Sequence, residues 1–368
     1  MKIDKKFNAM QVEKLKQLLT DNRENYRVDL HLHTSYSADG IQSVEQAFCH
    51  AKENHFDIIS ITDHDSILAY NEILSSGLYM REDMPIVIPG IEFTVSYPEY
   101  MGRCHVLKYF FDEEDEGFIN NLNQTQSAYG KRINLWFQRI EKNRSLQYFF
   151  QEKQIDCSED GFRKYLWKNE IRYADYPILM KYIYMLLSEK QVSVWDVYNR
   201  SIAENELDIC EERKQKRKMM LSRFYEKYRT QDIGGDFRKL RPILAPVGLD
   251  DYDYPEYESS GSLSISEFGQ VGIRELDNAG FNILAHPDIN RLSCVDELEG
   301  IISGLELNCH SSREANNEVE KKAIEKSMLI TKGSDKHDNT VEFYEDLNFY
   351  EWKRVYVESF LRKESKLV

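Results

Sequence analysis

Two histidines separated by a single residue are the first indication of chemistry in this chain. His31 and His33 follow an apolar run and flank Leu32. On an extended strand, side chains at positions i and i+2 point to the same face. Two imidazoles on one face can bind one metal ion, and bound metal ions support hydrolysis at neutral pH. The spacing therefore predicts a metal site at the end of a strand.

Further candidate ligands lie in short motifs along the sequence, nearly all at the ends of predicted strands. Six of the nine histidines belong to this set. The candidates are His31, His33, Asp39, His64, Glu92, His105, His286, Asp335 and His337. Each motif alone has an ordinary interpretation, such as a turn at Asp39-Gly40, but buried imidazoles and carboxylates are costly without partners. Together the motifs predict a multinuclear metal centre.

Length, composition and charge exclude several classes of protein. A chain of 368 residues with 41% hydrophobic residues suggests two ordinary domains, or one α/β barrel with an insertion. We see neither an apolar run long enough to span a bilayer nor a signal peptide. The six cysteines are scattered singly, so we expect reduced thiols and a cytoplasmic protein. The net charge of −15 opposes a large nucleic-acid surface, but not a small nucleotide or a short RNA end.

The order of the predicted elements indicates an α/β protein. Strands are predicted over 28–33, 57–62, 86–95, 104–110, 281–286, 305–309 and 329–334. Helices are predicted ahead of the first strand and over 43–54, 66–75, 264–279, 295–303, 312–327 and 350–363. Ser43 and Gln46 are spaced for a capping box. Alternating strands and helices favour a parallel barrel or a doubly wound sheet, and in barrels functional groups gather at the carboxyl ends of the strands.

The alternation stops between residues 115 and 262. This stretch is rich in Lys, Glu, Arg, Gln, Tyr and Phe and has helical periodicity, most clearly over 120–142, 178–189 and 202–228. Residues 249–262 have the composition of a loop. We therefore predict a mostly helical insertion over 115–262 between two parts of the main domain, 1–114 and 263–368.

The motifs resemble those of the PHP (polymerase and histidinol phosphatase) family of metal-dependent phosphoesterases. His-x-His, Thr-Asp-His-Asp, Gly-Ile-Glu, Ala-His-Pro and Gly-Ser-Asp-x-His occur in the family's order over residues 28–110 and 264–340. The resemblance implies a distorted (β/α)7 TIM-like barrel with a mostly helical inserted subdomain. It is strongest to the stand-alone nucleotide phosphoesterases, which include 5′–3′ exoribonucleases and carry a mostly helical insertion between the fourth and fifth motifs.

The resemblance also implies three divalent metal ions and their ligands. His31, His33, Glu92 and Asp335 would bind the first ion, Glu92 would bridge to a second held by His105 and His286, and Asp39, His64 and His337 would bind the third. Imidazoles mixed with carboxylates suit Mn²⁺, Zn²⁺ or Fe²⁺ better than Mg²⁺ or Ca²⁺, which prefer oxygen ligands.

Other residues near the motifs are candidates for catalysis and substrate binding. Asp63 and Asp65 flank His64, where one could orient an imidazole or donate a proton to the leaving group. Alternatively, Asp65-Ser66 simply caps the next helix. A phosphate pocket usually needs a cation besides the metals, for which Arg132 and Arg291 are candidates. His310 follows a strand and could line the rim of the pocket.

The leading functional hypothesis is a phosphoesterase that hydrolyses nucleotides or short oligonucleotides with a metal-activated water. Its partner would be a small phosphorylated substrate. One alternative is a histidinol-phosphate phosphatase, which the long insertion disfavours because a small substrate needs less cover. The other is a non-catalytic scaffold module, which the complete set of nine candidate ligands disfavours.

Overall fold

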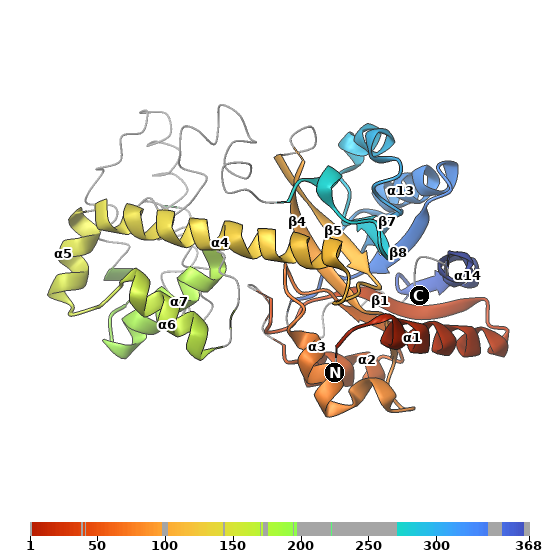
Figure 1. The fold of residues 1–368 in the computed structure, drawn as a ribbon, viewed down its shortest axis with the longest axis horizontal. Helices are drawn as coiled ribbons and strands as arrows, with labels where there is room; N and C mark the ends of the chain where they lie inside the picture. The colour runs from red at the N-terminus through yellow and green to blue at the C-terminus, as the bar shows by residue number, and fades with distance from the viewer. Residues whose placement is uncertain are drawn as a thin grey trace. The chain divides into compact units, whose positions relative to one another are not determined.

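The strands of this protein form two sheets in one of the two units of the chain (Figure 1). The computed structural model describes residues 2–37, 40, 42–97, 102–142, 144–169, 171, 176–193, 195–196, 222, 271–337 and 348–363. The first unit comprises residues 1–125 and 269–368, and the second residues 126–268. The predicted insertion over 115–262 begins and ends earlier in the chain than this second unit, and the predicted domain division stays a prediction. The predicted α/β class is confirmed.

Four strands form the first sheet and five form the second. The first has the order β3-β2-β1-β9, with β3 Ile86–Val87, β2 Ile58–Ile61, β1 Asn25–Leu32 and β9 Glu351–Lys353. The second has the order β4-β5-β6-β7-β8, with β4 Gly90–Tyr97, β5 Gly102–Tyr109, β6 Phe281–Leu284, β7 Gly304–Asn308 and β8 Leu329–Gly333. The predicted strands therefore exist, except that Pro89 divides the one expected over 86–95 into β3 and β4.

Helices pack around the two sheets. They are α1 Lys5–Leu18, α2 Val44–Glu53, α3 Ala69–Ser76, α13 Arg313–Glu325 and α14 Arg354–Arg362, with the short 3-10 helices η1 Leu19–Asp21 and η2 Leu78–Met80. The predicted capping box of α2 is confirmed, because Ser43 Oγ accepts from Gln46 N–H at 3.1 Å and Gln46 Oε1 accepts from Ser43 N–H at 2.8 Å. Packing of α13 against β7 and β8 covers one face of the second sheet.

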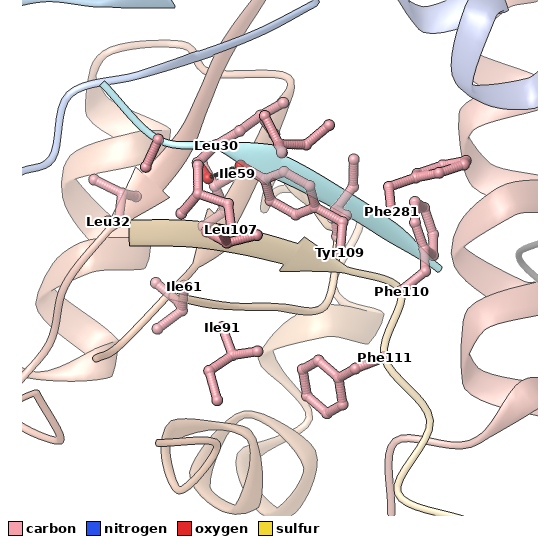
Figure 2. Close-up of a cluster of buried hydrophobic side chains, with 14 of the residues drawn as sticks. Leu30, Leu32, Ile59, Ile61, Ile91, Leu107, Tyr109, Phe110, Phe111 and Phe281 are labelled. Carbon is pink, nitrogen blue, oxygen red and sulfur yellow. Dashed lines mark hydrogen bonds between the residues drawn. The ribbon is translucent and has the colours of Figure 1, made fainter. Parts of the chain in front are cut away.

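Apolar side chains fill the space between the sheets. Figure 2 shows Leu30 and Leu32 of β1 and Ile59 and Ile61 of β2 in one cluster with side chains of β4, β5 and β6. Tyr109 of β5 also crosses to β1, where its hydroxyl donates to the Leu30 carbonyl at 2.6 Å. The interior is thus a packed core, which fixes where each strand ends.

The two sheets meet at isolated bridges rather than along continuous ladders. Leu32 pairs with Lys336 and His64 pairs with Glu92. Among the described residues no further ladder joins the sheets, so the predicted closed barrel is not seen. The sheets also contain antiparallel pairs, β4 with β5 and β5 with β6. The antiparallel direction of β4 and β5 follows from connection length, because only residues 98–101 separate them, which is too short for a parallel crossover.

Three predicted helices differ from the structure. The described part of 264–279 contains only the 3-10 helix η6 Ile273–Glu275, and the helix expected at 295–303 is the 3-10 helix η7 Ile289–Leu298. The last predicted helix begins instead as β9, where Trp352 is buried and its indole donates to Ile330 O at 2.9 Å. A three-residue strand is too short to show a period in the sequence.

All regular secondary structure in the described residues of the second unit is helical. Its elements are α4 Glu116–Lys142, which begins in the first unit, α5 Arg144–Glu152, α6 Glu159–Lys168 and α7 Tyr176–Glu189. Phe162 packs against Phe137 and Tyr182, with ring centroids 5.6 and 5.2 Å apart. The helices expected at 120–142 and 178–189 are confirmed, whereas 249–262 and all of 202–228 except residue 222 lie outside the described residues. None of the described helices is long and apolar enough to cross a membrane.

Gly90, at the start of β4, leaves no room for a side chain. A β-carbon there would overlap the Ser60 hydroxyl and lie 2.8 Å from Thr62 Cγ2. We expect Gly90→Ala to lower the free energy of unfolding by about 1–3 kcal/mol in urea denaturation. Gly130→Ala is the control, since no described residue lies within 4 Å of its β-carbon position in α4. A Gly90→Ala protein as stable as the native one would contradict this packing.

Candidate metal centre

Four of the predicted ligands surround one point at the end of β1. His31 Nε2 and His33 Nε2 lie 3.1 Å apart, and each is 3.1 Å from Glu92 Oε2. Asp335 Oδ1 lies 3.4 Å from His31 Nε2 and 3.1 Å from His33 Nε2. Ligands about 2.0–2.1 Å from a tetrahedral ion are separated by roughly 3.3 Å. The four donor atoms therefore have the spacing of a coordination shell.

The other oxygen of Glu92 belongs to a second group. Glu92 Oε1 lies 3.0 Å from His105 Nδ1 and 3.5 Å from His286 Nε2, and these two nitrogens are 3.3 Å apart. His64 Nδ1 approaches Glu92 Oε2 at 3.0 Å. One carboxylate thus contacts both groups, which is the arrangement expected of a ligand shared between two ions.

A third group consists of histidines alone. Donor atoms of His33, His64 and His337 lie within 4.8 Å of one another, and the rings of His33 and His337 stack with centroids 4.2 Å apart. Asp39, the remaining ligand predicted here, lies outside the described residues. The structure therefore brings together eight of the nine predicted ligands.

Strand pairing explains why these residues meet. In the β4–β5 hairpin Glu92 pairs with Leu107 and Thr94 with His105, so Glu92 and His105 are diagonal neighbours on one face. After β8 the chain runs beside the end of β1, where Asp335 N–H donates to His31 O at 2.9 Å. Asp335 has φ 55°, and this left-handed conformation turns its carboxylate toward the histidine pair.

The charges of the cluster strongly shift the pKa values of its carboxyl groups. Burial opposes the charged form of Glu92, but the imidazoles of His31, His64 and His105 outweigh it and hold the pKa of Glu92 well below its usual range. Burial likewise opposes ionisation of Asp335, and His31 and His33 lower the pKa of Asp335. Burial lowers the pKa of His105 to about 4, so this imidazole is neutral at physiological pH. Carboxylates and a neutral imidazole are the forms that bind metals.

Both aspartates flanking His64 hold the backbone of neighbouring segments. Asp63 accepts from Thr34 N–H at 2.6 Å and from the Thr34 hydroxyl at 2.7 Å, and burial raises the pKa of Asp63 to about 6. Asp65 accepts from Thr94 N–H at 2.9 Å. The alternative that Asp65-Ser66 caps the next helix is wrong, because α3 begins at Ala69 after Leu68. These contacts indicate positioning, and a catalytic role for Asp63 or Asp65 stays a prediction.

Sequence reasoning missed two residues that contact the cluster from behind. Glu306 Oε1 lies 2.8 Å from His31 Nδ1, and Ser37 Oγ lies 3.1 Å from His33 Nδ1. Such partners orient metal-binding imidazoles in many proteins. A lone Glu between Leu305 and Leu307 in an apolar strand was the available signal for Glu306. Ser37 carried no comparable signal, because serines are common in loops.

The predicted substrate-binding residues are only partly described. Arg132 lies in α4 and Arg291 in η7, but the side chains of both lie outside the described part of the structure. His310 is exposed after β7, where its N–H donates to Asn308 Oδ1 at 2.9 Å. Their roles in phosphate binding remain predictions.

The cluster has a buried floor and a more accessible rim. The side chains of His31, His33 and Glu92 are fully buried, whereas those of His105 and His286 are 27% and 35% exposed. Neither Glu92 oxygen has a hydrogen-bond partner among the described residues, although imidazole nitrogens surround both. Burying a carboxylate without hydrogen bonds costs free energy unless a cation binds it. The donor set therefore fits divalent ions such as Mn²⁺, Zn²⁺ or Fe²⁺.

The sequence pattern of the PHP domain family matches residues 29–218, just over half of the chain. The chain belongs to the PHP domain family. No curated protein sequence matches it.

Several solved structures are similar to the chain, and two of them illustrate the similarity. One is a protein from Bifidobacterium adolescentis provisionally assigned as a metal-dependent phosphoesterase, with 16% identity and a TM-score of 0.50 over 89% of this chain and 97% of the other. The second is an amidohydrolase from Chromobacterium violaceum with bound sulfate and no metal, with 14% identity and a TM-score of 0.46 over 89% and 98%. The first similarity supports the fold alone.

The shared contact of Glu92 leads to a prediction about metal content. Glu92→Gln should lose more than one equivalent of bound metal, because Glu92 touches two groups, whereas His337→Ala should lose at most one. Elemental analysis of purified proteins measures both, with His55→Asn, at an exposed position after α2, as the control. Equal losses in the two variants would contradict a shared ligand.

Metal affinity should rise with pH. Burial lowers the pKa of His31, but Glu306 and Glu92 raise it more, so the metal-free pKa of His31 lies well above its ordinary value. An incoming ion must displace that proton, and below this pKa affinity should rise by up to about tenfold per pH unit for each proton released. Calorimetry in two buffers of different ionisation enthalpy measures the release, and affinity independent of pH would contradict it.

Proposed function

We propose that this protein is a metal-dependent hydrolase, and more specifically a phosphoesterase that acts on nucleotides or short oligonucleotides. The observation that carries the proposal is the position of Glu92. Its fully buried carboxylate lies within 3.5 Å of nitrogen atoms from His31, His33, His64, His105 and His286. Multinuclear sites of this composition are typical of enzymes that hydrolyse phosphate esters.

Some residues of the cluster would bind the metal ions, and others leave space for the substrate to approach. His31, His33 and Asp335 would hold an ion with Glu92 Oε2, while His105 and His286 would hold a second with Glu92 Oε1. Ions bound there would activate a water and neutralise the phosphoryl oxygens of a substrate. The partly exposed rim leaves room for an ester to approach. The protein's buried floor keeps the ligands fixed during the reaction, so little reorganisation is needed.

The substrate class rests on the motifs, the net charge and the cysteines. The motifs resemble those of the nucleotide phosphoesterase branch, and the Bifidobacterium protein of similar fold is assigned to metal-dependent phosphoesterases. The net charge of −15 favours a small phosphorylated substrate or a short RNA end over a long nucleic acid. The five described cysteines form no disulfide bond with one another, which supports a reducing compartment such as the cytoplasm.

A substrate screen tests the proposal. With Mn²⁺, the purified protein should release phosphate or nucleoside from nucleoside 3′,5′-bisphosphates, nucleoside monophosphates or short 5′-phosphorylated RNAs. Removing two predicted ligands together, Asp335→Ala with His337→Ala, should lower turnover by at least about 10²-fold. Turnover of histidinol phosphate alone would favour the histidinol-phosphate phosphatase. Bound metal without turnover of any ester would contradict the enzyme and favour a scaffold module.

A further inference from the structure

Glu306 is a buried carboxylate in the middle of β7. It is 1% exposed and lies between Leu305 and Leu307. A buried carboxylate is costly unless its oxygens accept hydrogen bonds. Both oxygens of Glu306 do so, since Oε1 lies 2.8 Å from His31 Nδ1 and Oε2 accepts from the His286 backbone N–H at 2.7 Å.

The contact with His31 determines which ring nitrogen faces the candidate metal position. A neutral imidazole carries one N–H, on either Nδ1 or Nε2. His31 Nε2 faces Glu92 and His33 at 3.1 Å, so it must carry the lone pair if it binds an ion. The proton then belongs on Nδ1, where Glu306 Oε1 accepts it.

The contact with His286 stabilises an unusual backbone conformation at this residue. His286 has φ 30°, a positive value that is rare for residues other than glycine. This backbone conformation costs free energy, so it is found where surrounding contacts stabilise it. The hydrogen bond from His286 N–H to Glu306 fixes this turn and thereby the direction of the His286 ring.

Gly333 of β8 lies close to both His31 and Glu306. A β-carbon at Gly333 of β8 would overlap His31 Cβ and lie 2.5 Å from Glu306 Oε1. The absence of a side chain at residue 333 therefore allows β8 to approach both residues closely.

We propose that Glu306 is a positioning residue that couples a ligand of one ion to a ligand of the next. The inference rests on the proposed metal centre. A carboxylate is required because two N–H donors approach two different oxygens. The amide of glutamine has one oxygen, so its NH₂ group must face one of the donors, either His286 N–H or His31 Nδ1. In the second case the proton of His31 moves to Nε2, which can then no longer bind an ion.

The experiment compares Mn²⁺ binding to metal-free native protein, Glu306→Gln and Glu320→Gln. We expect Glu306→Gln to weaken Mn²⁺ binding about 10–100-fold in a chelator competition titration. Glu320→Gln is the matched control, because Glu320 lies on α13 and pairs with Lys353. Circular dichroism of the metal-free proteins checks that the variants fold.

The outcomes separate this inference from the proposed function. Weaker binding to Glu306→Gln alone supports the positioning role, and unchanged binding overturns that role while leaving the metal centre intact. A native protein that binds no Mn²⁺ overturns both. If Glu306→Gln does not fold, ¹⁵N spectra of the native Zn²⁺-loaded protein decide, since the role requires the His31 proton on Nδ1 and a proton on Nε2 would refute it.

Discussion

The buried carboxylate of Glu92 sets the main constraint on this structure. A charge without exposure to water needs cations or strong donors around it, and the free energy cost of leaving it alone is several kcal/mol. Here five imidazoles supply nitrogen atoms within 3.5 Å, from the ends of β1 and β6, the middle of β5 and the turn after β2. Because these segments are far apart in the sequence, the two sheets must come together at this point.

Three buried aspartates stabilise the backbone around that point. Asp29 accepts from Ser334 N–H at 2.9 Å, Asp63 from Thr34 N–H at 2.6 Å and Asp65 from Thr94 N–H at 2.9 Å. Each contact joins two segments that carry candidate ligands. The sheets are bridged only at isolated pairs there, so side-chain hydrogen bonds replace the missing ladder. This arrangement explains why so many acidic residues are buried near one site.

Local spacing made part of this arrangement predictable. The i, i+2 spacing of His31 and His33 follows from the two-residue period of a strand, and their Nε2 atoms do meet. The direction of β5 was not predictable from periodicity, because hydrophobic patterns do not distinguish parallel from antiparallel strands. Glu306 was missed since one residue has no period, and its partner His31 is 275 positions away. The strand β9 was not predictable either, because three residues are too few to show a period.

Anomalous diffraction from crystals grown with Mn²⁺ tests the central claim most directly. The account predicts one strong peak enclosed by His31 Nε2, His33 Nε2, Glu92 Oε2 and Asp335 Oδ1, and a second beside Glu92 Oε1. Full-occupancy peaks elsewhere on the protein, with none in contact with Glu92, would contradict it.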